Sequence, residues 1–310
     1  MDSKIFENLK NKNISQSSLK LYVNNLKRLN ENQEIKNFNF LKNVENIIDK
    51  IKDYKPNTRR SYIISIVSLL KQEPKLKKLY DSYYKILMDY NNDLKTNNSK
   101  SETQKENWIN QDEVLEIYNK IKSDTDGINE KKKITEADYD KLQKYLVLSL
   151  YTIQPPRRNI DYQYMLIVNK MTDDLDDKYN YLDLDKKEFH FNNYKTKGTY
   201  KCQTTEIKPE LMDVINLYLK YHPLKTVLKK KNGIVPFLVN FDGEPYNSNN
   251  FITRVLNKIF NKRIGVSMLR SIYLTNKFGD KVKELNDTAH DMGTSSNTIQ
   301  NQYIKTDESI

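Results

Sequence analysis

Four places along the 310-residue chain hold side chains of the kind that bind or attack a phosphate. The pair Arg157 and Arg158 directly follows two prolines, and the lysine-rich stretch YKTKGTYK comes after it. Arg270 stands among apolar residues in SMLRSIYLTNKF, and Tyr303 ends MGTSSNTIQNQY. Arginine offers a planar donor fork to phosphate oxygens, lysine can supply a proton, and a phenol can act as a nucleophile. These residue types suit cleavage of a phosphate ester without a metal.

The order of these residues resembles the catalytic domain of tyrosine recombinases, the phage-integrase-like enzymes that break and rejoin DNA. In that family, a T-G-x-R-x-x-E/D box supplies a first arginine and a β-hairpin turn supplies a lysine. An H-x-x-R box supplies the second arginine, and a tyrosine follows an L-G-H/W triplet by nine residues. In the stretch RRNID, Arg158 fits the first box better than Arg157, because Asp161 falls three positions after it.

The remaining family positions also have counterparts. Lys195 best fits the hairpin lysine, with Lys197 as the fallback, and Arg270 fits the second arginine. The triplet MGT ends at Thr294, and Tyr303 stands nine residues after it. The resemblance covers roughly residues 108–307, and the preceding helical region resembles the family's core-binding domain.

The resemblance implies a role for each of these side chains. Tyr303 would attack phosphorus and form a 3′-phosphotyrosyl link, which stores the bond energy so that rejoining needs no ATP. Arg158 and Arg270 would clamp the non-bridging oxygens, and Lys195 would protonate the leaving 5′ oxygen. We therefore expect these four side chains to converge on one backbone phosphorus, with no cofactor and no metal.

Two candidate catalytic positions depart from the family pattern. Ser267 stands where the family has histidine, and Thr294 stands where it has histidine or tryptophan. A hydroxyl can still donate a hydrogen bond, but it cannot act as a cationic acid or as a base near neutral pH. His290 lies four positions too early to fill the Thr294 slot, and we interpret it as an ordinary surface histidine.

The elements that must position these residues form two predicted domains. Residues 1–95 read as a helical DNA-binding (core-binding) domain, and residues 96–107 as a polar linker. Apolar periodicity and capping residues predict helices over 15–31, 39–51, 56–72 and 74–94.

The predicted catalytic domain, residues 108–310, mixes helices with a small sheet. Helical patterns cover 111–121, 136–153, 209–222, 249–260 and 266–278, and a final helix carries the tyrosine. The stretches YNYLDLD, FHFNNYK and YKCQTTEI predict three short strands joined by tight turns. The predicted fold class is therefore mainly α with a small antiparallel β-sheet.

The net charge of +11 is concentrated in the first domain. Residues 1–100 hold 20 Lys and Arg against 11 Asp and Glu, whereas the rest of the chain is nearly neutral. This asymmetry indicates a polyanion partner, although a solvated lysine surface is the competing interpretation. The DNA-binding candidates are Lys55, Thr58, Arg59 and Arg60 at the start of one predicted helix, together with Arg157 and Lys197.

Composition excludes several other classes. A single cysteine, Cys202, rules out an internal disulfide, and three scattered histidines argue against a metal site. No glycine-rich nucleotide loop occurs among the seven glycines. The chain has no long apolar run and no signal-peptide pattern at its start, so we expect an intracellular protein without a membrane partner.

These patterns lead to the hypothesis of a site-specific recombinase or integrase that acts on double-stranded DNA and self-associates on it as a dimer or tetramer. The form PPRRNID resembles integrases of large DNA viruses, virophages and related mobile elements, which implies the host cytoplasm or nucleus. Two alternatives stay open, a type IB topoisomerase-like enzyme and a catalytically weakened DNA-binding protein with the same fold. Taken singly, the arginines could pair with nearby acids and Tyr303 could serve packing.

Overall fold

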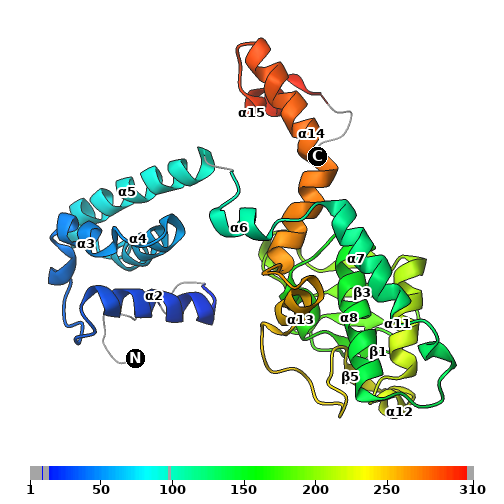
Figure 1. The fold of residues 1–310 in the computed structure, drawn as a ribbon. Coiled ribbons are helices and arrows are strands. Elements are labelled where there is room, and N and C mark those ends of the chain that lie inside the picture. The colour runs from blue at the N-terminus through cyan, green and yellow to red at the C-terminus, as the bar shows by residue number, and fades with distance from the viewer. Residues whose placement is uncertain (1–8, 10–13, 97–98, 306–310) are drawn as a thin grey trace. The chain divides into compact units, whose positions relative to one another are not determined.

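The computed structural model describes residues 9, 14–96 and 99–305, and it divides the chain into two compact units, Met1–Lys100 and Ser101–Ile310 (Figure 1). The division falls inside the predicted linker, 96–107. Part of that segment is helical, because α6 (Glu102–Asn107) begins at a capping box in which Ser101 and Gln104 satisfy each other's backbone N–H groups. No helix in the described ranges has the length and apolar character needed to cross a lipid bilayer.

The first unit is helical, as predicted. Its helices are α2 (Gln16–Leu29), α3 (Val44–Ile51), α4 (Pro56–Leu70) and α5 (Lys77–Thr96), with short 3-10 turns η2 (Asn39–Leu41) and η3 (Pro74–Leu76). Apolar residues at helical spacing, such as Ile63, Ile66 and Leu70 on α4, are fully buried in one core. A buried polar contact aligns α2 with α4. Asn25 on α2 donates to the hydroxyls of Ser61 and Ser65 on α4 at 3.2 and 3.1 Å.

The second unit packs its helices around the buried helix α8. The helices are α7 (Gln111–Ser123), η4 (Ile128–Glu130), α8 (Glu136–Thr152), α9 (Asn159–Gln163), α10 (Lys197–Tyr200), α11 (Pro209–Lys220), α12 (Lys225–Leu228), α13 (Phe251–Phe260), α14 (Val266–Asp291), α15 (Ser296–Thr298) and the π-helical turn η5 (Ile299–Tyr303). Helices α7, α11 and α13 contact α8, which is buried along its whole second half. The mainly helical fold class is thus confirmed.

The sheet of the second unit is larger than predicted. Its strands are β1 (Leu166–Val168), β2 (Tyr181–Asp183), β3 (Glu188–Phe191), β4 (Gln203–Glu206) and β5 (Ile234–Pro236), in the order β4-β3-β2-β1-β5. The three predicted strands are β2, β3 and β4, and they pair antiparallel. The expectation of a purely antiparallel, three-stranded sheet was wrong, because β1 runs parallel to β2 and β5 adds a further edge. Strands of three residues are too short to show an alternating pattern.

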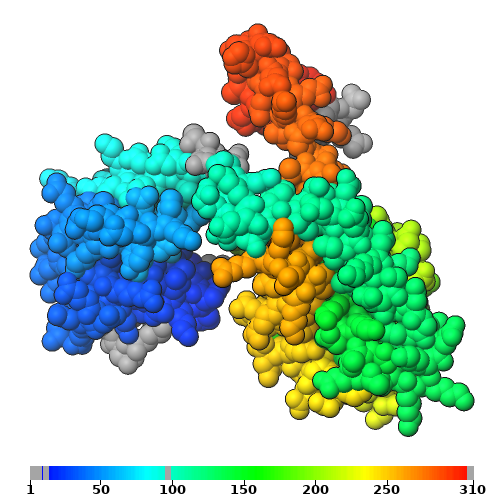
Figure 2. Space-filling model, in the orientation of Figure 1, coloured from blue at the N-terminus to red at the C-terminus, as the bar shows by residue number. Residues whose placement is uncertain are grey.

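Helix α14 is the other departure from the sequence prediction. The apolar pattern predicted a helix ending at residue 278, but α14 continues through Gly279 to Asp291. Its first half packs on the core through Val266, Leu269 and Ile272, all buried. Its distal half, with α15, extends away from the rest of the second unit (Figures 1 and 2). Local helix propensity, rather than burial, maintains that part of the helix.

A buried histidine makes the second unit sensitive to acid. His222 is fully buried, its Nδ1 accepts the N–H of Leu224 at 3.1 Å, and its Nε2 lies 3.2 Å from the carbonyl oxygen of Pro236. Protonation would give the ring a second N–H, because the new hydrogen would sit on Nδ1 and point directly at the Leu224 N–H. Burial accordingly lowers the pKa of His222 from 6.5 to about 4.

We predict that the second unit loses about 3 kcal/mol of stability between pH 6.5 and 4, because the unfolded chain binds this proton at a higher pH than the folded chain. The measurement is urea unfolding at pH 7.5 and 4, followed by fluorescence of Trp108, the chain's single tryptophan, which packs against this core. His222→Gln should be less stable at pH 7.5 and should show a smaller acid loss. The exposed His290→Gln is the control, and an equal acid loss in His222→Gln would contradict the assignment.

Candidate functional site

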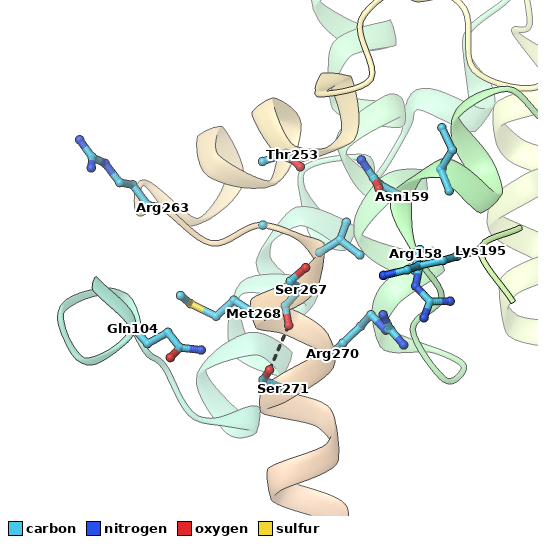
Figure 3. Close-up of a pocket in the computed structure, with 13 residues that line it drawn as sticks. Gln104, Arg158, Asn159, Lys195, Thr253, Arg263, Ser267, Met268, Arg270 and Ser271 are labelled. Atoms are coloured by element: carbon cyan, nitrogen blue, oxygen red, sulfur yellow. Dashed lines mark hydrogen bonds between the residues drawn. The ribbon is translucent and has the colours of Figure 1, made fainter. Parts of the chain in front are cut away.

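One pocket of the second unit, about 660 Å³ in volume, collects most of the predicted catalytic residues. Arg158, Lys195, Ser267 and Arg270 line it together, and Arg263 lines its edge with the guanidinium directed outward (Figure 3). None of the residues lining the pocket is acidic. Three cationic side chains around one hollow without a carboxylate make an anion-binding site.

Arg158 owes its place to the end of helix α8. Pro155 and Pro156 stop that helix, and the extended backbone of Arg158 then forms the N-cap of α9, where its carbonyl accepts the N–H of Asp161 at 3.0 Å. The half-buried side chain reaches the pocket (Figure 3). Within the described ranges it forms no ion pair, so its donor fork is available to a ligand.

Arg157, a predicted DNA-binding residue, is held by contacts within the second unit. Its Nε donates to the buried carboxylate of Asp161 at 2.9 Å, and its Nη1 donates to Gln203 at 3.1 Å. The guanidinium also lies 3.7 Å from the ring centroid of Phe191. Burial raises the pKa of Asp161, and the nearby charge of Arg157 opposes that rise. Arg157 therefore joins α9 to strands β3 and β4, and its charge is paired with the buried carboxylate of Asp161.

Lys195 and Lys197 also differ in their surroundings, because one lines the pocket and the other is ion-paired. Lys195 is exposed in the connection after β3 and lines the pocket. Lys197, also predicted to bind DNA, instead pairs with Asp177 at 2.9 Å, and that hydrogen bond raises its pKa. The loop carrying Lys195 is fastened by Asn180, which donates to Asn193 at 3.0 Å and to the carbonyl of Asp161 at 2.8 Å.

Ser267 and Arg270 lie in the first turns of α14, whose N-terminus borders the pocket. The N-cap is Gly265, which has no side chain to occupy the free N–H groups of the first turn. Those groups and the helix dipole add positive potential to the cations around the pocket. The Ser267 hydroxyl is exposed there, whereas its carbonyl accepts from Ser271 at 3.1 Å (Figure 3).

Tyr303 and Thr294 lie outside this pocket. Gly293, with φ +65°, ends α14, and the Thr294 N–H closes that cap on the Ala289 carbonyl at 2.9 Å. The chain then doubles back, and Ser296 donates to Asn286 on α14. Tyr303 ends the π-helical turn with 60% of its surface exposed.

Helix geometry sets the distance between Tyr303 and the cations. Along α14, Asn286 lies about 24 Å from Arg270, and the returning segment recovers at most about 11 Å of it. By this rise, the backbone at Tyr303 lies about 13 Å from that of Arg270 along the helix axis. Arg158, Lys195 and Arg270 line one pocket, and Tyr303 is not among its lining residues in this conformation.

The DNA-binding candidates of the first unit lie at the start of α4. Lys55 and Thr58 are exposed there, and Pro56 at the first helical position leaves the helix without a side-chain cap. Arg59 and Arg60 are half-buried. Arg60 donates to Asn91 on α5, and the Arg59 guanidinium lies 5.6 Å from the Tyr90 ring centroid. Both arginines therefore also hold α4 against α5.

Five polar pocket residues were not predicted from the sequence, namely Gln104, Asn159, Thr253, Arg263 and Ser271. Gln104 belongs to a segment interpreted as linker, and Arg263 belongs to the short connection between α13 and α14. A polar residue in a connection carries no periodic signal, so only the tertiary fold brings these side chains to the pocket. Within the described ranges, no group of three or more His, Cys, Asp or Glu is placed to hold a metal ion.

No protein-family model matches the chain, and no curated protein matches it. Among solved structures, the chain is similar to the crystal structure of XerA recombinase, with 14% identity over 98% of this chain and 92% of that chain. The TM-score is 0.34. A likeness at this level is too low to assign an activity, which must be argued from the pocket itself.

We predict that replacing the two adjacent arginines changes the stability of the second unit by very different amounts. Arg157→Ala should lower the free energy of unfolding of the second unit by about 3–5 kcal/mol, because it leaves the buried Asp161 unpaired. Arg158→Ala should change it by less than about 0.5 kcal/mol. Urea unfolding followed by Trp108 fluorescence measures both. Adding Asp161→Asn to Arg157→Ala should recover part of the loss, and an Arg158→Ala variant as unstable as Arg157→Ala would contradict these roles.

Proposed function

We propose that this protein cleaves and rejoins double-stranded DNA through a covalent link between Tyr303 and a 3′ phosphate, as a tyrosine recombinase does. The observation that carries the proposal is the pocket that Arg158, Lys195 and Arg270 line at the uncapped N-terminus of α14 without any carboxylate. Such a pocket suits the crowded, negatively charged phosphorus of phosphodiester exchange.

The proposed step is an exchange of esters. The phenol of Tyr303 releases its proton to solvent and its oxygen attacks phosphorus. The bond from phosphorus to the 5′ oxygen breaks, and Lys195 gives a proton to that oxygen. Arg158 and Arg270 hold the non-bridging oxygens, and the Ser267 hydroxyl donates a further hydrogen bond. In rejoining, a 5′ hydroxyl attacks the phosphotyrosyl ester and releases Tyr303. The number of ester bonds is unchanged, so the reaction needs neither ATP nor a cofactor.

Delivery of Tyr303 requires a change from the conformation described above. From Leu274 onward, α14 and its cap expose Leu274, Phe278, Val282 and Met292, an apolar surface that a soluble helix normally covers. We propose that this segment docks when DNA is bound, either on its own unit or on a second copy of the chain. The second route makes self-association on DNA part of the reaction.

DNA is the proposed partner of both units, and Lys55 and Thr58 are the exposed candidates for phosphate contacts in the first unit. Site-specific integration or excision is the proposed biological outcome. The form PPRRNID favours an integrase of a virus or another mobile element, acting inside a host cell. Thr294 is proposed to act only after the segment carrying Tyr303 has docked.

A nicked duplex that releases its short 5′ end tests the chemistry. The wild-type chain should form a covalent DNA adduct, because loss of the released fragment prevents rejoining, and Tyr303→Phe should form none. Arg158→Ala and Arg270→Ala should slow trapping by about 100–1,000-fold, since each removes a preorganised donor worth roughly 3–4 kcal/mol. The adduct is measured on denaturing gels over a panel of duplex sequences. An adduct formed equally well by Tyr303→Phe would refute the role of Tyr303.

Mixing two inactive variants identifies the route by which Tyr303 reaches a pocket. Tyr303→Phe keeps the cationic pocket and Arg270→Ala keeps the phenol, so only delivery to a second copy lets the mixture react. We expect an adduct on the Arg270→Ala chain, which a mass tag distinguishes. Alone, Tyr303→Phe should form no adduct, and Arg270→Ala should form it only at its slowed rate, so the mixture is compared with that rate. A mixture that is inactive beside an active wild type would place the reaction within one chain.

A non-catalytic DNA-binding protein is the second candidate, favoured by the distance of Tyr303 from the pocket and by Ser267 in place of histidine. Tight, salt-sensitive duplex binding by the wild type without any adduct would support it. A type IB topoisomerase-like activity would instead relax supercoils without producing joint molecules, and plasmid assays with the wild-type chain separate the two.

A further inference from the structure

A second hollow of the second unit, about 400 Å³ in volume, adjoins the pocket that holds the candidate catalytic residues. Arg158 and Arg270 line both of them, whereas Lys195 and Ser267 line only the first. The other walls of the second hollow come from the residues just after α8, from the start of α9, from the connection after β3, and from α10 and β4. The second hollow can therefore influence both arginines without containing the rest of the phosphate site.

Two buried side chains that line this hollow carry an oxygen without a hydrogen-bond partner. Gln154 is 5% exposed and Asp161 is 1% exposed. Arg157 donates to Oδ2 of Asp161, but Oδ1 of Asp161 and Oε1 of Gln154 have no partner within the described ranges. Proteins pair nearly all of their buried acceptors, because an unpaired one has lost its water without compensation. These two oxygens therefore require a donor in some state of the protein.

Arg270 is placed to be that donor. A guanidinium carries five N–H donors, and within the part of the chain that the structure describes no hydrogen bond or ion pair engages that of Arg270. Its charge reaches the buried groups beside the hollow, because burial raises the pKa of Tyr151 and the positive charge of Arg270 opposes that rise. Tyr151 precedes Gln154 by three residues, about one helical turn. Figure 3 shows the Arg270 side chain directed toward Arg158, the other arginine shared by the two hollows.

We propose that Gln154 is a positioning residue for Arg270. When a phosphate occupies the first pocket, Oε1 of Gln154 accepts a hydrogen bond from an Arg270 N–H that the phosphate does not use. The phosphate needs only two donors of the fork, so the guanidinium can serve both partners at once. The inference rests on the proposed function, since it gives Gln154 a part in the same reaction.

An amide oxygen suits this role because it is neutral. The neighbouring Arg157 pairs with the carboxylate of Asp161, which compensates its charge. An amide would orient Arg270 and leave its full positive charge for the phosphate. Fixing the donor fork before the reaction should lower the barrier of the chemical step, and it should add little to the affinity for duplex DNA.

A double-mutant cycle on the trapping rate with the nicked duplex tests the role in the full-length chain. Gln154→Met keeps the length of the side chain without the oxygen, and it should slow adduct formation about 10-fold at saturating duplex, through loss of one hydrogen bond to a charged group. The affinity for the duplex should stay within about 2-fold, because the phosphate contacts remain. In the Arg270→Ala background, adding Gln154→Met should slow trapping by less than about 2-fold, because the donor is already gone.

The chain offers a matched control in Gln163. This residue is also a buried glutamine whose Oε1 has no partner among the described residues, and it lines neither hollow. Gln163→Met should therefore leave the trapping rate unchanged. Gln154→Asn keeps the amide but is one carbon shorter, so it withdraws the oxygen with less disturbance of the core and repeats the comparison should Gln154→Met not fold.

Two results would overturn the positioning role and leave the proposed function standing. One is equal slowing by the Gln154 variants in the wild-type and Arg270→Ala backgrounds, and the other is an unchanged trapping rate in those variants. A wild-type chain that binds the duplex but forms no adduct would refute the proposed function, and the role of Gln154 in that reaction would fall with it.

Discussion

The contact between Arg157 and Asp161 is the constraint on which the pocket depends. It draws together the start of α9 and strands β3 and β4, since the same guanidinium contacts Phe191 and Gln203. Chain connectivity then dictates that the next residue, Arg158, faces the pocket. A buried pair of this kind is strongly destabilised when one partner is lost, so the geometry around it is rigid. Because Arg157 occupies the carboxylate of Asp161, this carboxylate does not pair with the neighbouring Arg158.

Helix α14 runs from the pocket to the cap that precedes Tyr303, and its length keeps the two apart. Its first turn supplies Ser267 and Arg270, and its far end carries the cap that leads to Tyr303. In this conformation the continuous helix holds the cap that carries Tyr303 away from Arg270. Gly279, in the exposed middle of the helix, has the lowest helix propensity of the residues around it. A bend there would cost little, which makes this glycine the natural pivot for docking on the same unit.

Much of this arrangement could be predicted from the sequence, and the failures have physical causes. Helices with a strong apolar period, such as α3 and α13, were predicted because burial and periodicity coincide in them. Arg158, Lys195 and Arg270 were found because their order along the chain carries information. The partner of Arg157 was not found, because a contact from α9 to β4 is not local. The length of α14 was also missed, since its exposed half has no burial pattern.

Ser267 illustrates how the fold can compensate for a missing residue type. A histidine at this place could supply a cationic donor, and a serine can supply only a neutral one. The residue is, however, in the first turn of a 26-residue helix whose N-cap is glycine. Unpaired backbone N–H groups and the helix dipole therefore act at the position where the histidine charge would lie. Because these groups do not titrate, a pocket built on them would keep its affinity for phosphate as pH rises through the range where histidine loses its charge.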